Sequence, residues 1–176
     1  MKRAIFILML ALALFSCKSY KPASENPNYK PLEYFGTDTL AFYKYNFEEH
    51  KDFYVGKEMS YVINDMGKYA SAVPIPKYDK QYKADCIKGI TLFLEPWGDI
   101  YVSKKGYSDR IIVWFYENEY LLEESYYEKM REERSKISKG KSKQEVRNEL
   151  NHKLRDYFFS DKKVKDIEVF RIDTKD

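Results

Sequence analysis

Apolar residues recur at helical spacing early in the chain, between residues 38 and 66. Thr37 or Asp38 precedes them, and either side chain can accept a hydrogen bond from the free backbone N–H groups at a helix start. Gly56 interrupts the period and Gly67 ends it, because glycine readily adopts the left-handed conformation in which helices stop. The pattern predicts two helices joined at Gly56. Their apolar faces are Leu40, Tyr43, Phe47 and Tyr54 in the first helix, and Met59, Val62, Ile63 and Met66 in the second.

From Ala70 onwards the pattern becomes extended. Val73–Pro76 contains two prolines, each of which removes a donor from a strand ladder, so it predicts an edge strand or an extended arm. The polar stretch Lys77–Asp85 predicts a loop. Arg110–Tyr116 is apolar on both faces, which predicts a central strand covered on each side. Together, segments 87–95, 100–104 and 110–117 predict an antiparallel meander.

A charged helical pattern separates the meander from the last strand. A thin apolar stripe runs from Leu122 to Ile137, and Ser142 and Glu145 then form a capping box that starts a second helix. Lys165–Ile172 alternates again and predicts the closing strand. The sequence therefore predicts an α+β fold. An N-terminal helical pair packs on one face of an antiparallel β-meander, with a helical insertion before a C-terminal strand.

The chain begins with two cations, Lys2 and Arg3, followed by the uncharged apolar run Ala4–Phe15 and the small residue Ser16. This order is typical of a secretory signal. A run of twelve residues is too short for a helix that spans a membrane, which needs about 20. We therefore predict export, with Cys17 left at the new N-terminus. The alternative is an ordinary cleaved signal in which the cysteine is incidental.

The motif Leu14-Phe15-Ser16-Cys17 resembles the lipobox of bacterial lipoproteins. The resemblance implies that the signal is cut before Cys17, that its sulfur is diacylated, with palmitate-type chains, and that the new amine is acylated. Two or three acyl chains hold a protein firmly on a bilayer, so lipid is the expected partner of Cys17. Lys18 stands where an aspartate would indicate inner-membrane retention. We therefore expect the outer membrane, on its periplasmic or surface face.

These assignments divide the chain into three parts. Residues 1–16 are the signal peptide. Residues 17–36 are a lipidated tether, because they hold three of the six prolines and show no apolar period. Residues 37–176 form a single α+β domain, long enough to bury a core.

A second resemblance concerns the region 53–117. Gly56, Val62-Ile63 and Met66-Gly67, followed by strands, are similar to the small outer-membrane-assembly lipoproteins that place a helical hairpin on a three-stranded sheet. More broadly, the chain resembles the small Lys- and Tyr-rich lipoproteins of unknown function in Bacteroidota-type bacteria. Both resemblances imply a role at the cell envelope.

Composition narrows the partner classes. The formal charge of +3 falls to +1 when Lys2 and Arg3 leave with the signal, so no nucleic-acid partner is expected. Seventeen Tyr and eleven Phe have two interpretations: rings that pack with their hydroxyls in water, or an aromatic surface for a glycan or peptide. Under the second interpretation, Trp97 and Tyr101 at the turn between strands contact an envelope protein or glycan.

Catalytic motifs are missing from the sequence. His50 and His152 are far apart, and neither an H-E-x-x-H nor a G-x-S-x-G motif occurs. We therefore predict no catalytic residue, no metal ligand and no cofactor. Cys86 is expected to be a small buried apolar residue. The basic stretch Lys136–Lys143 is interpreted either as a solvated turn or as a contact for anionic lipid.

The expected function is that of an envelope-anchored, non-catalytic binding or assembly module. One alternative is an envelope hydrolase whose carboxylates carry no recognisable motif. Another is a lipoprotein that inhibits or guards a second secreted protein.

Overall fold

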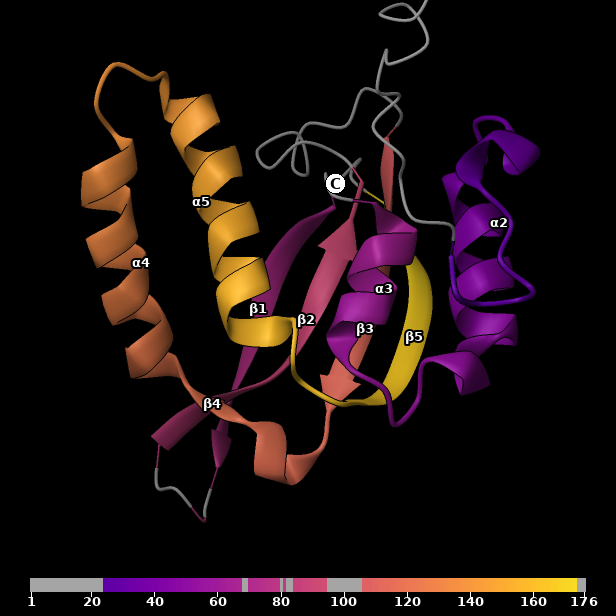
Figure 1. Ribbon diagram of the computed structural model, residues 1–176, viewed down its shortest axis with the longest axis horizontal. Coiled ribbons are helices and arrows are strands. Elements are labelled where there is room, and N and C mark those ends of the chain that lie inside the picture. The colour runs from indigo at the N-terminus through magenta and orange to yellow at the C-terminus, as the bar shows by residue number, and fades with distance from the viewer. Residues whose placement is uncertain (1–23, 68–69, 80, 82–83, 95–105, 174–176) are drawn as a thin grey trace, which may run out of the picture.

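The computed structural model describes residues 24–67, 70–79, 81, 84–94 and 106–173, which fold into an antiparallel sheet with helices against it (Figure 1). The strands are β1 (Ser71–Asp79), β2 (Ala84–Phe93), β3 (Tyr107–Phe115), β4 (Leu121–Leu122) and β5 (Val164–Asp173). The α-helices are α2 (Thr39–Tyr43), α3 (Met59–Met66), α4 (Glu123–Ile137) and α5 (Lys143–Phe159). Shorter helical segments are η1 (Leu32–Phe35), η2 (Lys44–Glu49), η3 (Lys51–Phe53) and η5 (Glu117–Glu119).

The strand order is β1-β2-β3-β5, and β4 pairs with β2. Strand β3 lies between β2 and β5, and its inward side chains Ile111, Val113 and Phe115 are at most 1% exposed. The predicted central position is thus confirmed, but Arg110, Ile112 and Trp114 on the other face of β3 are only half-buried, so the described structure does not show the predicted cover on both sides. Strand β1 has a partner only in β2 among the described strands, which confirms the predicted edge strand.

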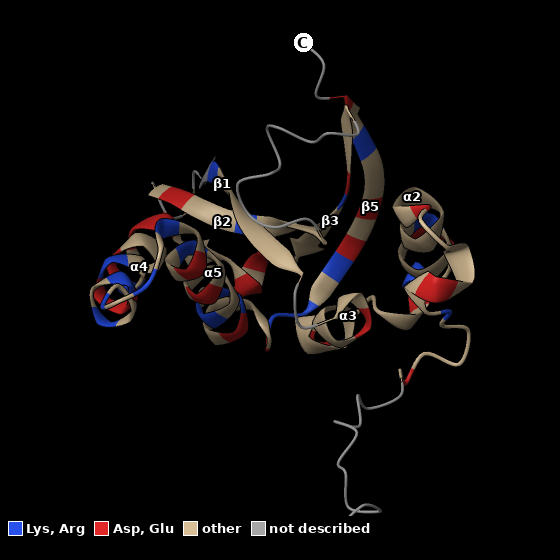
Figure 2. Ribbon diagram, turned by 90° about the horizontal axis from the view of Figure 1, so that it is seen from above, with Lys and Arg blue, Asp and Glu red and all other residues tan. Residues whose placement is uncertain are grey.

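One buried cluster joins the helices to a single face of the sheet. It contains Ile90 and Val113 from the sheet, Phe47 from the N-terminal helical region and Leu154 from α5. Figure 2 shows the sheet strongly curved, with α3, α4 and α5 along one side of it and α2 flanking β5. The predicted α+β class is therefore confirmed, including the helical insertion before the last strand.

The first N-terminal helix is less regular than predicted. Asp38 caps α2 by accepting from the backbone N–H of Ala41 at 3.0 Å, but η2 continues as a π-helix and η3 as a 3₁₀-helix. The fully buried Asn46 gives a reason, because its amide donates to the carbonyl of Phe42, four residues back. Such a side-chain bond competes with the helical ladder.

The predicted loop Lys77–Asp85 was too long. Strand β1 extends to Asp79 and β2 begins at Ala84, so the two strands pair over the full length of β1. Lys77 and Asp85 are exposed, and a strand ribbon open to water accepts such polar side chains. The expected strand 100–104 lies outside the described residues.

The two prolines of β1 lie on the side of the strand that needs no ladder donor. Ala72 turns its backbone N–H and C=O away from β2, towards the side chain of Asn151 on α5. Because backbone groups alternate along a strand, Pro74 and Pro76 turn their nitrogens the same way. Proline therefore fits at the edge without breaking the pairing with β2.

Ser24–Gly36, part of the stretch interpreted as a tether, packs against the body. Asp65, only 5% exposed, accepts hydrogen bonds from the Ser24 hydroxyl at 2.7 Å and from the Tyr54 hydroxyl at 2.8 Å. Asn26 donates to the Tyr54 hydroxyl, and the Tyr29 hydroxyl donates to the backbone oxygen of Asp65 at 2.9 Å. The packed body therefore includes Ser24. We call Ser24–Lys30 the N-terminal strap.

Candidate functional site

A groove of about 640 Å³ lies between the edge strand β1 and the hairpin formed by α4 and α5. The two helices run antiparallel beside β1 (Figure 1). We call this feature the hairpin groove. Its volume falls in the range of small-molecule pockets, about 300–1,000 Å³. The apolar part of its wall consists of Val73, Tyr126, Met130, Val146, Leu150 and Leu154.

The sequence builds the groove from two helices with narrow apolar stripes. Val146, Leu150 and Leu154 recur at intervals of four, so they line one face of α5. The capping box fixes where α5 begins: the Ser142 hydroxyl accepts from the N–H of Glu145 at 3.3 Å, and the Glu145 carboxylate accepts from the N–H of Ser142 at 2.8 Å. This predicted cap is confirmed. Hydrogen bonds from Ser142 hold the pKa of Glu145 below its usual range.

Side chains of α5 fasten the helix to the edge of the sheet. The Asn151 amide accepts from the N–H of Ala72 at 2.7 Å and donates to the carbonyl of Ala72 at 2.5 Å. One turn further on, the buried Arg155 donates to the carbonyl of Ala70 at 2.5 Å. The Asn151 amide thus pairs with the N–H and C=O of Ala72, as the backbone of a neighbouring strand would. Asn151 also lines the groove.

One end of the groove is apolar and closed by aromatic rings. Tyr126 is 5% exposed, and its ring stacks on Phe159 with the centroids 5.9 Å apart. Burial, with a smaller contribution from Tyr127, raises the pKa of Tyr126 to about 12. A neutral phenol therefore faces this end at physiological pH.

The opposite end of the groove is cationic. Arg134 comes from the last turn of α4, and Lys143 and Arg147 come from the first turns of α5. Three carboxylates of the hairpin are paired with other lysines: Glu132 and Glu133 with Lys129 and Lys136, and Glu149 with Lys153 and with Lys141, which also lines the groove. Two lysines on Glu132 lower its pKa to about 2. Among the described residues, no ion pair involves the three cations at the mouth of the groove.

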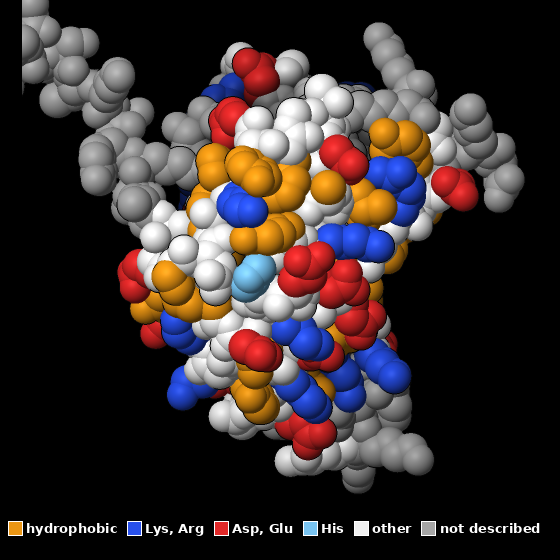
Figure 3. Space-filling view, turned by 90° about the vertical axis from the view of Figure 1, so that its right-hand side faces the viewer, with side chains coloured by type: hydrophobic (Ala, Val, Ile, Leu, Met, Phe, Trp, Pro, Cys, Tyr) orange, Lys and Arg blue, Asp and Glu red, His pale blue; other side chains and the backbone are white. Residues whose placement is uncertain are grey.

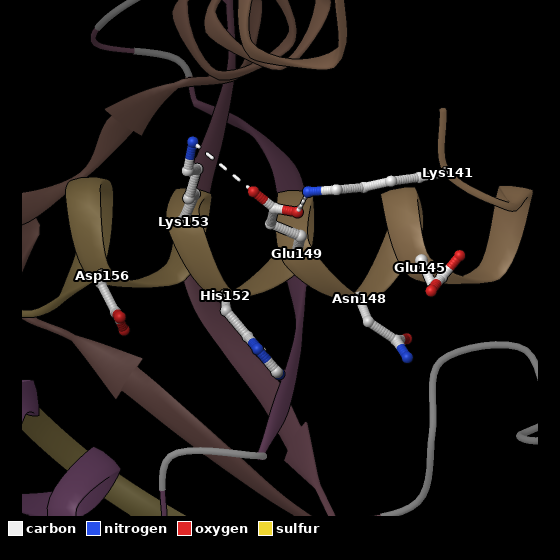
Figure 4. A pocket seen from close by; sticks show the side chains of 7 residues that line it. All are labelled: Lys141, Glu145, Asn148, Glu149, His152, Lys153 and Asp156. Atoms are coloured by element: carbon white, nitrogen blue, oxygen red, sulfur yellow. Dashed lines mark hydrogen bonds and ion pairs between the residues drawn. The ribbon is translucent and has the colours of Figure 1, made fainter. Parts of the chain in front are cut away.

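A second, shallower hollow lies along the outer face of α5 (Figure 4). His152 and Asp156 occur here, which is the type of pair that a hydrolase would need. Glu149 lies between Lys141 and Lys153 and is neutralised by them. All of the lining residues belong to α5 or to the turn before it, so no second described element forms an opposing wall. A substrate would lie on a single helix face there, and the hairpin groove is the stronger candidate.

Figure 3 shows the opposite side of the molecule, where hydrophobic side chains lie among basic and acidic ones. The ammonium of Lys30 lies 4.4 Å from the ring centre of Tyr34 and 4.2 Å from that of Tyr45. The His50 ring packs against Tyr45 with the two ring planes tilted by 54°, and its Nδ1 lies 2.7 Å from the backbone oxygen of Tyr45. The Lys30 ammonium, the tyrosine rings and His50 therefore have their partners within this cluster. The contacts of Lys30 also hold the C-terminal end of the N-terminal strap in place.

The residues that sequence reasoning singled out are not brought together by the described structure. Cys17, Trp97 and Tyr101 lie outside the described residues. His50 and His152 lie on different elements, in η2's cap and in α5. Cys86 is 1% exposed, which confirms the prediction that it is a small buried residue.

Sequence reasoning missed the groove itself. The apolar stripes of α4 and α5 were visible, but nothing in the sequence indicated that β1 would lie beside them. Of the lysines in the basic stretch Lys136–Lys143, only Lys141 and Lys143 line the groove. Arg134 and Arg147 were not singled out, because isolated arginines on charged helices usually face water.

Neither a metal site nor a membrane-spanning helix is found among the described residues. No group of three or more His, Cys, Asp or Glu side chains is placed to hold a metal ion. In the same part of the chain, no helix has the length and apolar character needed to cross a bilayer.

Comparison with known proteins adds no family to this geometry: no protein-family model, no curated protein and no solved structure matches the chain.

Proposed function

We propose that this chain is an exported, lipid-anchored binding module of the bacterial envelope, without catalytic activity of its own. Its binding site is the hairpin groove. The observation that carries the proposal is a hollow of ligand size, apolar along its walls and cationic at its mouth, formed by three elements of the described chain. Concave apolar sites with a few polar groups are the usual form of small-molecule sites.

The walls of the groove are preformed. Asn151 and Arg155 hold α5 against the edge of the sheet through backbone groups of β1. Strand β1 itself pairs along its full length with β2. A ligand would therefore enter an existing hollow, which avoids the free-energy cost of ordering the site on binding.

The N-terminal strap supports the anchor as part of the same proposal. The lipidated residue would be Cys17, seven residues before Ser24. A fully extended chain advances at most about 3.6 Å per residue, so the body would stay within about 25 Å of the bilayer. In Figure 2 the strap enters beside α2, on the side away from the hairpin, so the groove would be free to meet ligand.

Filling the groove tests the binding site. The full chain, held in phosphatidylcholine nanodiscs, is exposed to a photoactivatable long-chain alcohol, and the labelled peptides are identified by mass spectrometry. We expect labelling on α4, α5 and β1 around the groove.

Met130→Trp places a ring in the hollow and should reduce that labelling about tenfold. Leu122→Trp adds the same ring at a 44% exposed position outside the groove and should leave labelling unchanged. Equal labelling of the two variants would exclude the groove.

The anchor is tested separately through Cys17. The precursor is produced in a bacterium that processes lipoproteins, supplied with an alkyne fatty acid, and its intact mass is measured. We expect the wild type to lose residues 1–16 and to carry the label. Cys17→Ser should keep residues 1–16 and carry none. Normal processing and labelling of the serine variant would remove the anchor from the proposal.

A further inference from the structure

We infer that the ligand of the hairpin groove is a single-chain anionic amphiphile, such as a long-chain carboxylate or a lysophospholipid. Its anionic group would lie at Arg134, Lys143 and Arg147, and its chain would extend along Met130 and Leu150 towards Tyr126. The inference rests on the proposed binding function and adds the chemical class of the ligand.

The charge of the ligand follows from the ion pairs of the hairpin. Its acidic side chains Glu132, Glu133 and Glu149 already bind other lysines. Arg134, Lys143 and Arg147 line the groove without an ion-pair partner in the described chain. A carboxylate or phosphate at this point would gain charge-assisted hydrogen bonds, which are about twice as strong as neutral ones. Arginine in particular matches both anions through two parallel donors.

The shape of the ligand follows from the polarity along the groove. The cations gather where α4 ends and α5 begins, and the far end is formed by Tyr126 and Leu154, which are 5% and 2% exposed. From Tyr126 to Ser138 the helix α4 advances about 18 Å, at 1.5 Å per residue. The site is therefore long, and charged at one end only. An amphiphile with a terminal anion has the same two properties.

An extended peptide fits this site less well. A peptide beside an edge strand is held by main-chain hydrogen bonds to that strand. Here the outward backbone groups of Ala72 are already bonded to Asn151, and Pro74 has no N–H to donate. An alkyl chain needs no such bonds. It gains free energy by covering apolar surface alone, about 25 cal/mol per Å².

A bilayer surface also fits poorly. Val146 and Leu150 at the bottom of the groove are each 8% exposed, so only a molecule that enters the groove can reach them. A flat membrane would contact the cations at the mouth and leave the apolar walls uncovered. We therefore assign the site to a detached amphiphile.

The test uses two photoactivatable probes of equal chain length, a fatty acid and the matching fatty alcohol. The full chain is held in phosphatidylcholine nanodiscs, and labelling is mapped by peptide. We expect the acid to label the groove about tenfold more strongly than the alcohol. In the triple variant R134Q/K143Q/R147Q, labelling by the acid should fall about tenfold, to the level that the alcohol shows in the same variant. The control R131Q/K139Q/K165Q removes three exposed cations that do not line the groove, and it should behave as the wild type.

Several outcomes would overturn the inference. If the alcohol labels the groove as strongly as the acid, the ligand is an amphiphile without a required charge, and the binding function stands without this inference. If neither probe labels the groove, the proposed function itself fails. A third arm adds nanodiscs containing anionic phosphatidylglycerol. Hydrogen exchange of the backbone amides around Arg134, Lys143 and Arg147 is then compared between the arms. If phosphatidylglycerol slows this exchange and the acid probe does not, the cations bind a membrane surface and the inference is wrong.

Discussion

At the scale of single residues, Asp65 connects the N-terminal strap to the body. It is the one acidic residue of α3 and is 5% exposed. Its carboxylate accepts hydrogen bonds from two hydroxyls, those of Ser24 and Tyr54. Burial, together with the negative charge of Asp65, raises the pKa of Tyr54, so this phenol remains a donor. A buried carboxylate is tolerated only when such donors surround it.

We therefore predict that Asp65→Asn loosens the strap. Both hydroxyls donate to the same carboxylate oxygen, Oδ2. The amide oxygen of asparagine can take that position and accept both bonds, but it carries no charge. A hydrogen bond to a charged group contributes about 1 kcal/mol more than a neutral one, so the two bonds together lose about 1–3 kcal/mol. Urea unfolding should show a loss in this range, and chymotrypsin should cut faster after Tyr29 in the N-terminal strap. Asp52→Asn makes the same change at an exposed position and serves as the control. Equal stability of the two variants would contradict the role given to Asp65.

The sequence did not reveal this role, and the reason is physical. Within Asn64-Asp65-Met66 an aspartate is indistinguishable from a solvated helix residue, because its partners Ser24 and Tyr54 are 41 and 11 residues away. The buried apolar positions were easier to predict, because the burial of an apolar residue follows from its type and its spacing along the helix. Met59, Val62, Ile63 and Met66 are all buried as predicted. Buried polar contacts depend on pairs, and the sequence alone does not show pairs.

At the scale of elements, α5 protects the free edge of β1. An unpaired edge strand presents N–H and C=O groups to which another chain can add. Here the two prolines of β1 remove donors, and Asn151 occupies both outward groups of Ala72. The helix thus completes the sheet at an edge where the described strands include no further partner, and its position there creates the hairpin groove.

Replacing Asn151 by alanine should expose that edge. The N–H and C=O of Ala72 lose their partners, and water that enters the groove replaces them only in part, so we expect a destabilisation of about 1–2 kcal/mol in urea unfolding. The freed edge should also promote self-association at high protein concentration, measured by light scattering. Asn148→Ala, at a position on α5 that does not contact β1 among the described residues, is the matched control. A monomeric Asn151→Ala variant of unchanged stability would contradict the edge-protecting role.

Elements were predicted best where the local signal is self-contained. Ser142 and Glu145 predicted their helix start because a capping box involves neighbours only. The first N-terminal helix was predicted too regular, since the buried Asn46 bonds to Lys30 and Phe42 and diverts a helix carbonyl. The position of β1 beside α5 depends on the whole topology, which explains why the groove did not emerge from the sequence.

At the scale of the whole molecule, tyrosines connect the core to the polar network. Tyr126 is a buried residue of α4 and stacks on Phe159, while Tyr29 packs edge-on against Phe42 from the N-terminal strap. Burial is the main cause that raises the pKa of each to about 12; the charge of Asp65 contributes for Tyr29. The folded state therefore keeps these phenols neutral at a pH at which an unfolded tyrosine, with a pKa near 10, has begun to ionise.

This difference predicts a specific loss of stability in alkali. Below pH 10 both states hold the phenolic protons, and the contribution to stability is complete. Above pH 10 the unfolded chain releases protons that the folded chain retains, so the free energy of unfolding falls, by about 1.4 kcal/mol per pH unit for each such tyrosine. Tyr126→Phe should reduce the slope by about that amount between pH 10 and 11, measured by urea unfolding at several pH values. Tyr157→Phe, at a ring that is 64% exposed, should keep the wild-type slope. If Tyr126→Phe keeps that slope as well, Tyr126 is not held neutral by the fold, and the apolar end of the hairpin groove is wetter than its burial indicates.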